Sequence, residues 1–150
     1  MKRNTMLAAI GAAALAMAGM SPVMAEDITI GVIANLTGQD VNTSVQMARG
    51  VEIAADEINK AGGIGGKTIK LIVEDSEYKT QEALTAATKL YDVDKVPAVI
   101  MFGGSSLMIA VAELVKQEGK VFINTSSSSA KLGDYPGTLF SILPLDDILG

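Results

Sequence analysis

The feature that most constrains the fold is a regular alternation between short runs of β-branched residues and longer segments with helical periodicity. Each short run stops at a polar or glycine-rich loop, which is typical of buried parallel strands. The runs lie at residues 28–33, 68–73, 98–102, 121–123 and 138–142. Apolar residues recur every three or four positions between the first four runs, which indicates amphipathic helices. These helices are expected at residues 43–61, 80–91 and 106–118.

This order of elements predicts an α/β fold, a parallel sheet with helices on both faces. Right-handed crossovers place the loops that follow the strands at the same edge of the sheet. The loops at residues 35–43, 74–77, 103–106 and 124–129 are therefore expected to share one rim. Ligands of open α/β sheets bind just beyond the carboxyl ends of the strands.

Two of these rim loops are rich in small hydroxyl residues. Ser105 and Ser106 follow the third predicted strand, and residues 126–129 are all serine after the fourth. Hydroxyls and free backbone N–H groups at neighbouring strand ends form a neutral cradle for a small polar ligand. Gly103-Gly104 precedes a predicted helix, whose N-terminus suits a single carboxylate. The alternative is that the loops are solvated connectors, in which serine is common because it favours turns.

The N-terminus has the three-part layout of a secretory signal peptide. Lys2 and Arg3 make the start basic, residues 6–20 are almost entirely apolar, and Val23 and Ala25 supply small residues at the −3 and −1 positions of an expected cleavage after Ala25. A membrane anchor is the alternative, but the apolar run is shorter than the roughly 20 residues that span a bilayer. We therefore expect removal of residues 1–25, a periplasmic location for residues 26–150, and no membrane insertion after cleavage.

Composition excludes several functions. Removal of residues 1–25 leaves ten basic residues against 17 acidic ones, a net charge of −7. An acidic chain with no basic patch is not expected to bind nucleic acid. The sequence has no cysteine and no histidine, so Ser-His-Asp or Cys-His catalysis and His-based metal sites are excluded within these 150 residues. We expect neither enzymatic activity nor a cofactor.

Two further motifs have an ordinary explanation. Residues 61–68, AGGIGGKT, fit a relaxed phosphate-binding loop. They leave a helix and enter a strand, the reverse of the order that phosphate binding needs, so we interpret them as a helix stop and turn. Glu74, Asp75 and Glu77 cluster at a strand end, as ligands of Ca²⁺ or Mg²⁺ do. They lack further oxygen ligands at a fixed spacing, so a solvated acidic loop is the preferred interpretation.

Two helix boundaries are predicted from local patterns. Thr43 and Gln46 have the spacing of a capping box, which predicts the start of the first helix. Residues 146–150 resemble the first turn of another helix, with acids at its start. We expect a fragment of a longer protein, and a truncated reading frame is the alternative.

Several segments resemble one known family. They are LTG at residues 36–38, GVEIAADEINKAGGIGGKTIKLIVED at 50–75, QEALTAATKL at 81–90 and AVI at 98–100. The chain resembles periplasmic substrate-binding proteins of ABC importers, of the branched-chain-amino-acid (Leu/Ile/Val-binding) type, over nearly all of residues 28–150. The resemblance implies a type I periplasmic-binding fold, in which two α/β lobes joined by a hinge close on a ligand. Residues 26–150 then hold most of the N-terminal lobe.

The resemblance also implies which residues bind ligand. In that family, a serine after the third strand and groups after the fourth hold the α-carboxylate and α-amine of the ligand. The matching positions here are Ser105, Ser106, Ser126, Ser127 and Ser128. Thr43 lies where an aromatic residue often lines the side chain of the ligand. The acid that usually pairs with the ligand's ammonium lies in the second lobe, beyond residue 150.

The chain departs from the family pattern at several positions. Gln39 stands where proline often follows LTG, and Met101-Phe102 replaces a Gly-Pro pair. Residues 125–128 replace a Pro-Ser-Ala-Thr type segment. The family disulfide is missing, with Glu77 and Gly104 at its approximate positions. These departures leave specificity for leucine, isoleucine or valine open.

The resemblance implies a solute receptor that captures an amino acid or similar small carboxylate and delivers it to a membrane permease. Two alternatives stay open. An extracytoplasmic sensor domain of the same fold would need a transmembrane segment and a signalling module downstream. An exported hydrolase would need a base from outside these residues.

Overall fold

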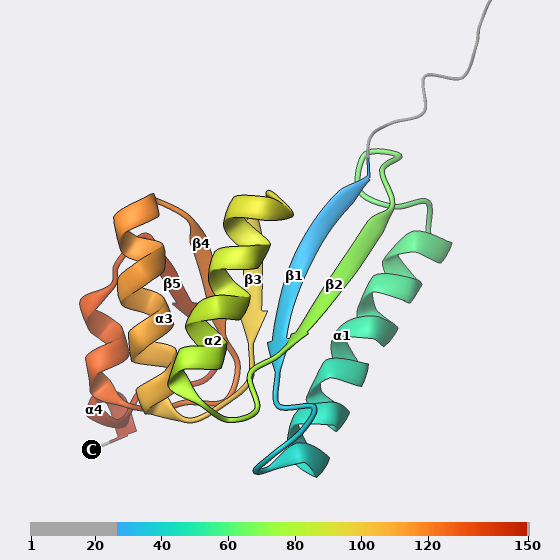
Figure 1. Cartoon of the computed structure of the whole chain (residues 1–150). Helices are drawn as coiled ribbons and strands as arrows, with labels where there is room; N and C mark the ends of the chain where they lie inside the picture. Colours follow the sequence, from blue (N-terminus) through green and yellow to red (C-terminus); the bar gives the residue numbers. More distant parts are fainter. Residues whose placement is uncertain (1–26, 150) are drawn as a thin grey trace, which may run out of the picture.

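The computed structural model describes residues 27–149, which form one five-stranded sheet with helices on both faces (Figure 1). The strands are β1 (Ile28–Ala34), β2 (Ile69–Asp75), β3 (Ala98–Met101), β4 (Val121–Asn124) and β5 (Leu139–Ser141). All neighbours pair in parallel, in the order β2-β1-β3-β4-β5. The predicted α/β class is therefore confirmed. The predicted signal peptide, residues 1–25, lies outside the described residues.

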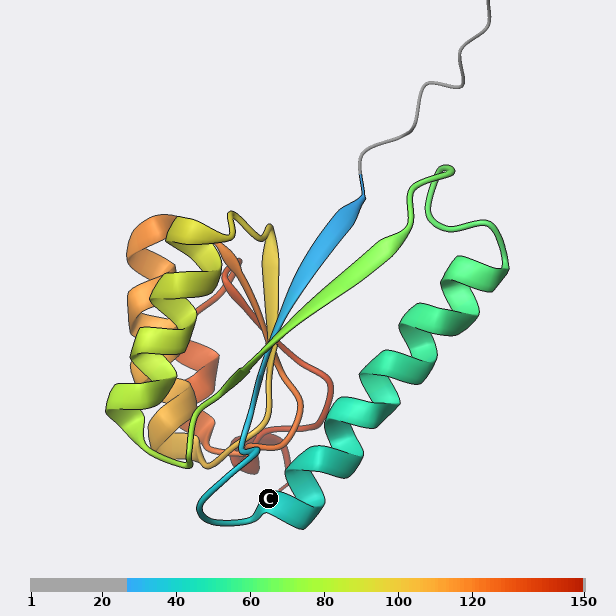
Figure 2. The same ribbon diagram turned by 45° about the vertical axis from the view of Figure 1, so that its right-hand side comes forward.

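The helices follow the strands in the predicted order. They are α1 (Val41–Lys60), α2 (Thr80–Thr88), α3 (Ser105–Glu118) and α4 (Asp146–Leu149), with a π-helical segment η1 (Lys89–Val93) and a 3₁₀ turn η2 (Ala130–Asp134). The α2 and α3 helices cover one face of the sheet, and α1 lies on the other (Figure 2). The second predicted helix differs, because its last turn widens into η1. Within residues 27–149, no helix combines the length and apolarity that a membrane crossing needs.

The larger core lies between the sheet and the α2–α3 pair. Leu90, Val99, Met108, Val111 and Phe122 are fully buried there. Burial of a large apolar side chain contributes about 1.5–3 kcal/mol, so this face supplies most of the stabilisation of the fold. A smaller cluster under α1 contains Val32, Ala34, Ala48 and Phe102.

The capping box predicted at Thr43 and Gln46 is wrong. The α1 helix begins at Val41, and its N-cap is Asp40, whose backbone is left-handed (φ 57°, ψ 29°) and whose side chain makes no cap hydrogen bond. A capping side chain needs an extended N-cap residue. Contacts with the neighbouring loop instead bring the chain into α1 through a left-handed turn. Thr43 is exposed in the first turn of the helix.

The end of α1 also differs from the predicted pattern. Ile58 continues the apolar period of the helix but is 37% exposed. The polar residue Asn59 instead turns toward the sheet: its amide donates to the backbone oxygen of Ile69 (2.9 Å) and accepts from the Ile69 N–H (2.7 Å). Because β2 is an edge strand, these backbone groups have no neighbouring strand to pair with. Asn59 therefore supplies hydrogen-bond partners to backbone groups at the exposed edge of the sheet.

The segment at residues 61–68 is a turn, as predicted. Gly62, Gly63, Gly65 and Gly66 all have positive φ, and one isolated bridge joins Ile64 to Lys67. A Cβ at Gly63 would lie 2.1 Å from a backbone oxygen, so only glycine fits this turn. The segment leads into β2 and opens no helix.

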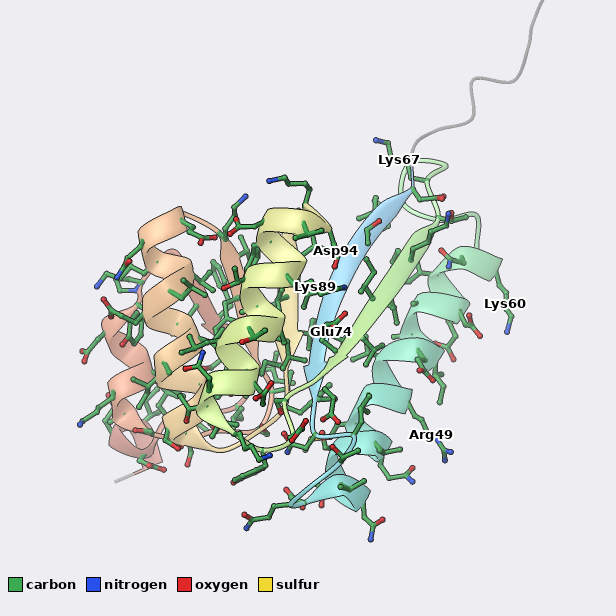
Figure 3. All side chains as sticks on the ribbon, in the orientation of Figure 1. Arg49, Lys60, Lys67, Glu74, Lys89 and Asp94 are labelled. Carbon is green, nitrogen blue, oxygen red and sulfur yellow. The ribbon has the colours of Figure 1, made fainter. Side chains whose placement is uncertain are left out.

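Two of the acids at the end of β2, Glu74 and Glu77, each pair with a separate lysine. Glu74 pairs with Lys89 (2.7 Å), which also pairs with Asp94 (3.0 Å), as Figure 3 shows for the labelled side chains. Glu77 pairs with Lys79 (2.6 Å). No group of three or more potential metal ligands occurs among residues 27–149.

Candidate functional site

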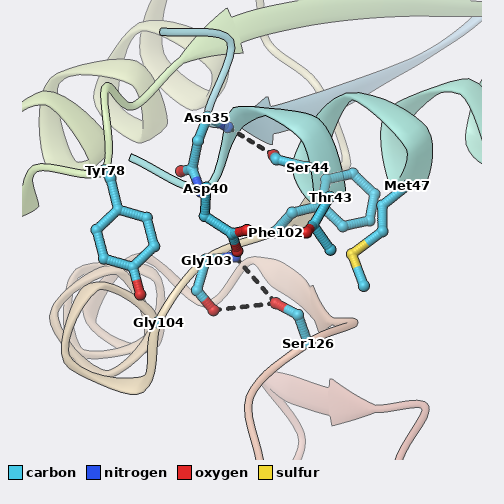
Figure 4. A pocket seen from close by; sticks show the side chains of 10 residues that line it. All are labelled: Asn35, Asp40, Thr43, Ser44, Met47, Tyr78, Phe102, Gly103, Gly104 and Ser126. Carbon is cyan, nitrogen blue, oxygen red and sulfur yellow. Dashed lines mark hydrogen bonds between the residues drawn. The ribbon is translucent and has the colours of Figure 1, made fainter. Parts of the chain in front are cut away.

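A pocket of about 230 Å³ lies at the carboxyl ends of β1, β3 and β4, where the sequence predicted a common rim. Its lining comes from four loops and from the first turns of α1 (Figure 4). The lining residues are Asn35, Asp40, Thr43, Ser44, Met47, Tyr78, Phe102, Gly103, Gly104 and Ser126. The volume is just below the range of about 300–1,000 Å³ for ligand sites, so the pocket suits a small molecule.

The wall formed by α3 offers hydrogen-bond donors. The N-cap of α3 is Gly104, and no side chain caps this terminus. The first N–H groups of a helix have no intrahelical partner and carry the positive end of the helix dipole. Ser105 and Ser106 form the first turn, with Ser105 half-buried and Ser106 exposed. This terminus can accept a carboxylate without a cationic side chain.

The loops after β3 and β4 are joined through Gly103. The Gly103 N–H donates to Ser126 Oγ (2.9 Å), and the hydroxyls of Ser126 and Ser127 both donate to the Gly103 oxygen (3.0 and 2.7 Å). Ser127 is buried. These two hydroxyls therefore already hold the pocket wall together, and their contact with a ligand stays a prediction.

The buried side chain of Asn124 fixes the serine loop, residues 126–129. Its side chain is fully buried and donates to the Ser127 oxygen (2.6 Å) and to Ser141 Oγ (2.9 Å). Its amide oxygen accepts from the N–H groups of Ser126 (3.3 Å) and Ser127 (3.0 Å). Four hydrogen bonds to one buried amide fix the loop conformation.

The conformation of the loop after β1, which forms another wall of the pocket, depends on Asp75. Its carboxylate accepts hydrogen bonds from the N–H groups of Leu36 (2.9 Å), Thr37 (3.3 Å) and Glu77 (2.8 Å), and from the Thr37 hydroxyl (2.5 Å). Burial raises the pKa of Asp75, but these hydrogen bonds outweigh burial and hold the pKa below its ordinary value. Asp75 thus fixes the loop that leads to Asp40 and α1.

Tyr78 completes this side of the pocket. Its backbone is left-handed, as is that of Glu77 before it (φ 56° and 49°). The turn brings the phenol against the start of α3, where a Cβ at Gly104 would lie 2.6 Å from the Tyr78 hydroxyl. Glycine at position 104 therefore leaves room for the phenol.

Of the predicted site residues, the structure brings Thr43 and Ser126 into the pocket lining. Ser105 and Ser106 lie at its edge, in the first turn of α3. Ser128 follows the joined loops, and its backbone oxygen accepts from the Asp146 N–H (2.7 Å). The ligand contacts of all six predicted residues stay predictions.

Sequence reasoning missed most of the lining. Asn35, Asp40 and Tyr78 lie in the predicted rim loops or directly beside one, which is the signal that could have singled them out. Met47 and Phe102 were assigned only to helix and strand. Their approach to the pocket depends on how α1 and β3 pack.

Comparison with known proteins identifies the class. Residues 27–148 match the periplasmic binding protein family. The chain belongs to this family. Its sheet and helices are also similar to those of a solved structure, the branched-chain amino acid transporter substrate-binding protein LivJ from Streptococcus pneumoniae in complex with isoleucine. That match has a TM-score of 0.75 and 29% identity, and covers 80% of this chain and 34% of LivJ.

Curated relatives carry amino-acid-binding names. An amino acid binding protein from Pseudomonas aeruginosa is 34% identical over 114 residues, which are 76% of this chain and 30% of the relative. The Leu/Ile/Val-binding protein BraC3 from Rhizobium johnstonii is 30% identical over 126 residues, 84% of this chain and 34% of the relative. The chain thus spans about a third of the length of the relatives it matches.

Proposed function

We propose that the chain forms one wall of the ligand cleft of an extracytoplasmic solute-binding protein that captures an amino acid or a similar small carboxylate. In this proposal, residues 26–150 are the N-terminal part of the first of two lobes. The loaded protein acts in the periplasm and delivers its ligand to the permease of an ABC importer. Family membership and the names of the relatives support this assignment.

The observation that carries the proposal is the uncapped N-terminus of α3 at the edge of a small polar pocket. The α-carboxylate of the ligand accepts hydrogen bonds from the N–H groups and hydroxyls of Ser105 and Ser106. Groups on Ser126, Ser127 and Ser128 hold the rest of the amino acid head, and Thr43 lies near its side chain. A carboxylate bound in this way needs no cationic partner, because the helix terminus supplies the positive potential.

A thermal-shift screen of the full-length protein against the common amino acids and other small carboxylates tests the proposal. A ligand that binds only the folded state stabilises it by about 2.7 kcal/mol at 100 times its Kd, which raises the melting temperature measurably. We expect at least one amino acid to give a shift that Ser105→Ala or Ser128→Ala abolishes. Thr88→Ala, which removes an exposed hydroxyl on α2, is the matched control and should keep the shift. Absence of a shift with every compound of the screen would contradict the proposal.

A further inference from the structure

The pocket contains two polar groups that the fold itself does not use. The first is the side-chain amide nitrogen of Asn35. Asn35 is 1% exposed, and its amide nitrogen has no hydrogen-bond partner within the part of the chain that the structure describes. An unpaired buried N–H donor costs about 1–3 kcal/mol, so such a group is expected to have a partner in the functional state.

Neighbouring groups fix this amide in place. The Ser76 hydroxyl donates to the Asn35 amide oxygen (2.6 Å), and the Asn35 backbone N–H donates to Ser44 Oγ (2.7 Å). Ser76 is itself fully buried. Because the oxygen of the amide is engaged, its nitrogen is the group left without a partner, buried in the wall of the pocket that Asn35 lines.

The second unused group is the carboxylate of Asp40. It does not cap α1, and no hydrogen bond or ion pair to this carboxylate occurs among residues 27–149. In Figure 4 the Asp40 side chain extends into the space between Asn35 and Ser126. Aspartate tolerates a left-handed backbone, which explains why a small polar residue stands here. Asparagine tolerates a left-handed backbone as well, so the backbone conformation does not explain why residue 40 carries a negative charge.

We propose that Asp40 and Asn35 select a ligand whose side chain carries N–H donors, and that this pocket is not built for a purely aliphatic side chain. This inference rests on the proposed function, which places the carboxylate of the ligand at α3. A side-chain carboxamide satisfies both groups, since its N–H donates to Asp40 and its oxygen accepts from Asn35. A side-chain ammonium or guanidinium satisfies Asp40 alone.

The two groups also predict poor binding of leucine. An aliphatic side chain in this pocket would leave the Asn35 N–H without a partner and would displace water from the Asp40 carboxylate. A site that is built to hydrogen-bond a polar group discriminates strongly against an analogue that lacks that group. Thr43, Ser44 and Ser126 add further hydroxyls to the lining, and Met47 and Phe102 supply its apolar part.

Isothermal titration calorimetry of the full-length protein with leucine, glutamine, lysine and arginine tests the inference. We expect glutamine or a basic amino acid to bind more tightly than leucine. Asp40→Asn keeps the size and the left-handed tolerance of the residue while it removes the charge. It should weaken binding of the preferred amino acid about fivefold, the effect of losing a solvent-accessible ion pair or charge-assisted hydrogen bond. Asp56→Asn, an exposed acid on α1 away from the pocket, should change nothing.

Each outcome is decisive. Tightest binding of glutamine identifies the carboxamide, and tightest binding of lysine or arginine identifies the cation. Tightest binding of leucine, unchanged in Asp40→Asn, overturns this inference but leaves the proposed function intact. If Asp40→Asn weakens binding of leucine as much as binding of the preferred amino acid, Asp40 contacts the α-ammonium that all amino acids share. That result would also overturn this inference. Binding of none of the four amino acids would overturn this inference, whereas the proposed function is contradicted only if the thermal-shift screen also finds no ligand.

Discussion

Replacement of Asp75 by alanine is expected to destabilise the protein in a pH-dependent way. The carboxylate accepts four hydrogen bonds, three from backbone N–H groups and one from the Thr37 hydroxyl. A hydrogen bond to a charged group contributes about 1.5–3 kcal/mol. The four bonds share one carboxylate, and N–H groups freed in this open loop are rehydrated, so the sum is far from additive. We expect Asp75→Ala to lower the free energy of unfolding by about 2–3 kcal/mol near neutral pH.

The sign of the pH dependence follows from the pKa of Asp75. That pKa is lower in the folded protein than the value of about 3.9 in an unfolded chain. The contribution of Asp75 is therefore complete above about pH 5, where the unfolded chain is also fully ionised, and is lost as the pH falls through the folded pKa. The difference in unfolding free energy between the wild type and Asp75→Ala should be constant above about pH 5 and should shrink below about pH 4.

Urea unfolding followed by circular dichroism, repeated across this pH range, measures the difference directly. Asp56→Ala, which changes an exposed acid on α1, is the control and should stay within about 0.5 kcal/mol of the wild type. The reasoning is refuted if Asp75→Ala costs no more than this control. It is also refuted if the cost of Asp75→Ala is the same at every pH.

Two further predictions concern the backbone and the serine loop. Gly63→Ala places a Cβ against a backbone oxygen at positive φ, and should destabilise by at least about 1–2 kcal/mol in urea unfolding. Gly50→Ala, in open space on α1, should instead stabilise by up to about 1 kcal/mol, and the same sign for both would contradict the account. Asn124→Ala removes four hydrogen bonds of a buried amide, so it should cost about 2–4 kcal/mol and weaken ligand binding. Retention of full stability by Asn124→Ala would show that the serine loop holds its conformation without it.

The architecture was predictable because it depends on local pattern. Runs such as residues 28–33 and 98–102 are too short and too β-branched for helices, and the intervening segments have a clear helical period. That order leaves few topologies, since crossovers are right-handed and parallel neighbours need helical connections. The shared rim of loops followed from the topology, and the structure places the pocket there.

The lining of the pocket was not predictable in the same way. Asp40 and Tyr78 reach it through left-handed backbone conformations that no local pattern signals. Those conformations arise from contacts between loops 39 residues apart in the chain, such as that of Asp75 with Leu36. The same contacts explain the failure of the predicted capping box at Thr43. Asn59 shows a related effect, since its inward orientation depends on an unpaired strand edge and not on helical period.

A crystal structure of the full-length protein with the amino acid that binds it most tightly is the most direct test of the central claim. The account predicts that a carboxylate oxygen of the ligand lies within hydrogen-bond distance of Ser105 or Ser106, at the N-terminus of α3. The side chain of the ligand should then extend toward Asn35 and Asp40. A ligand bound elsewhere, with the N-terminus of α3 in contact with solvent alone, would contradict the account.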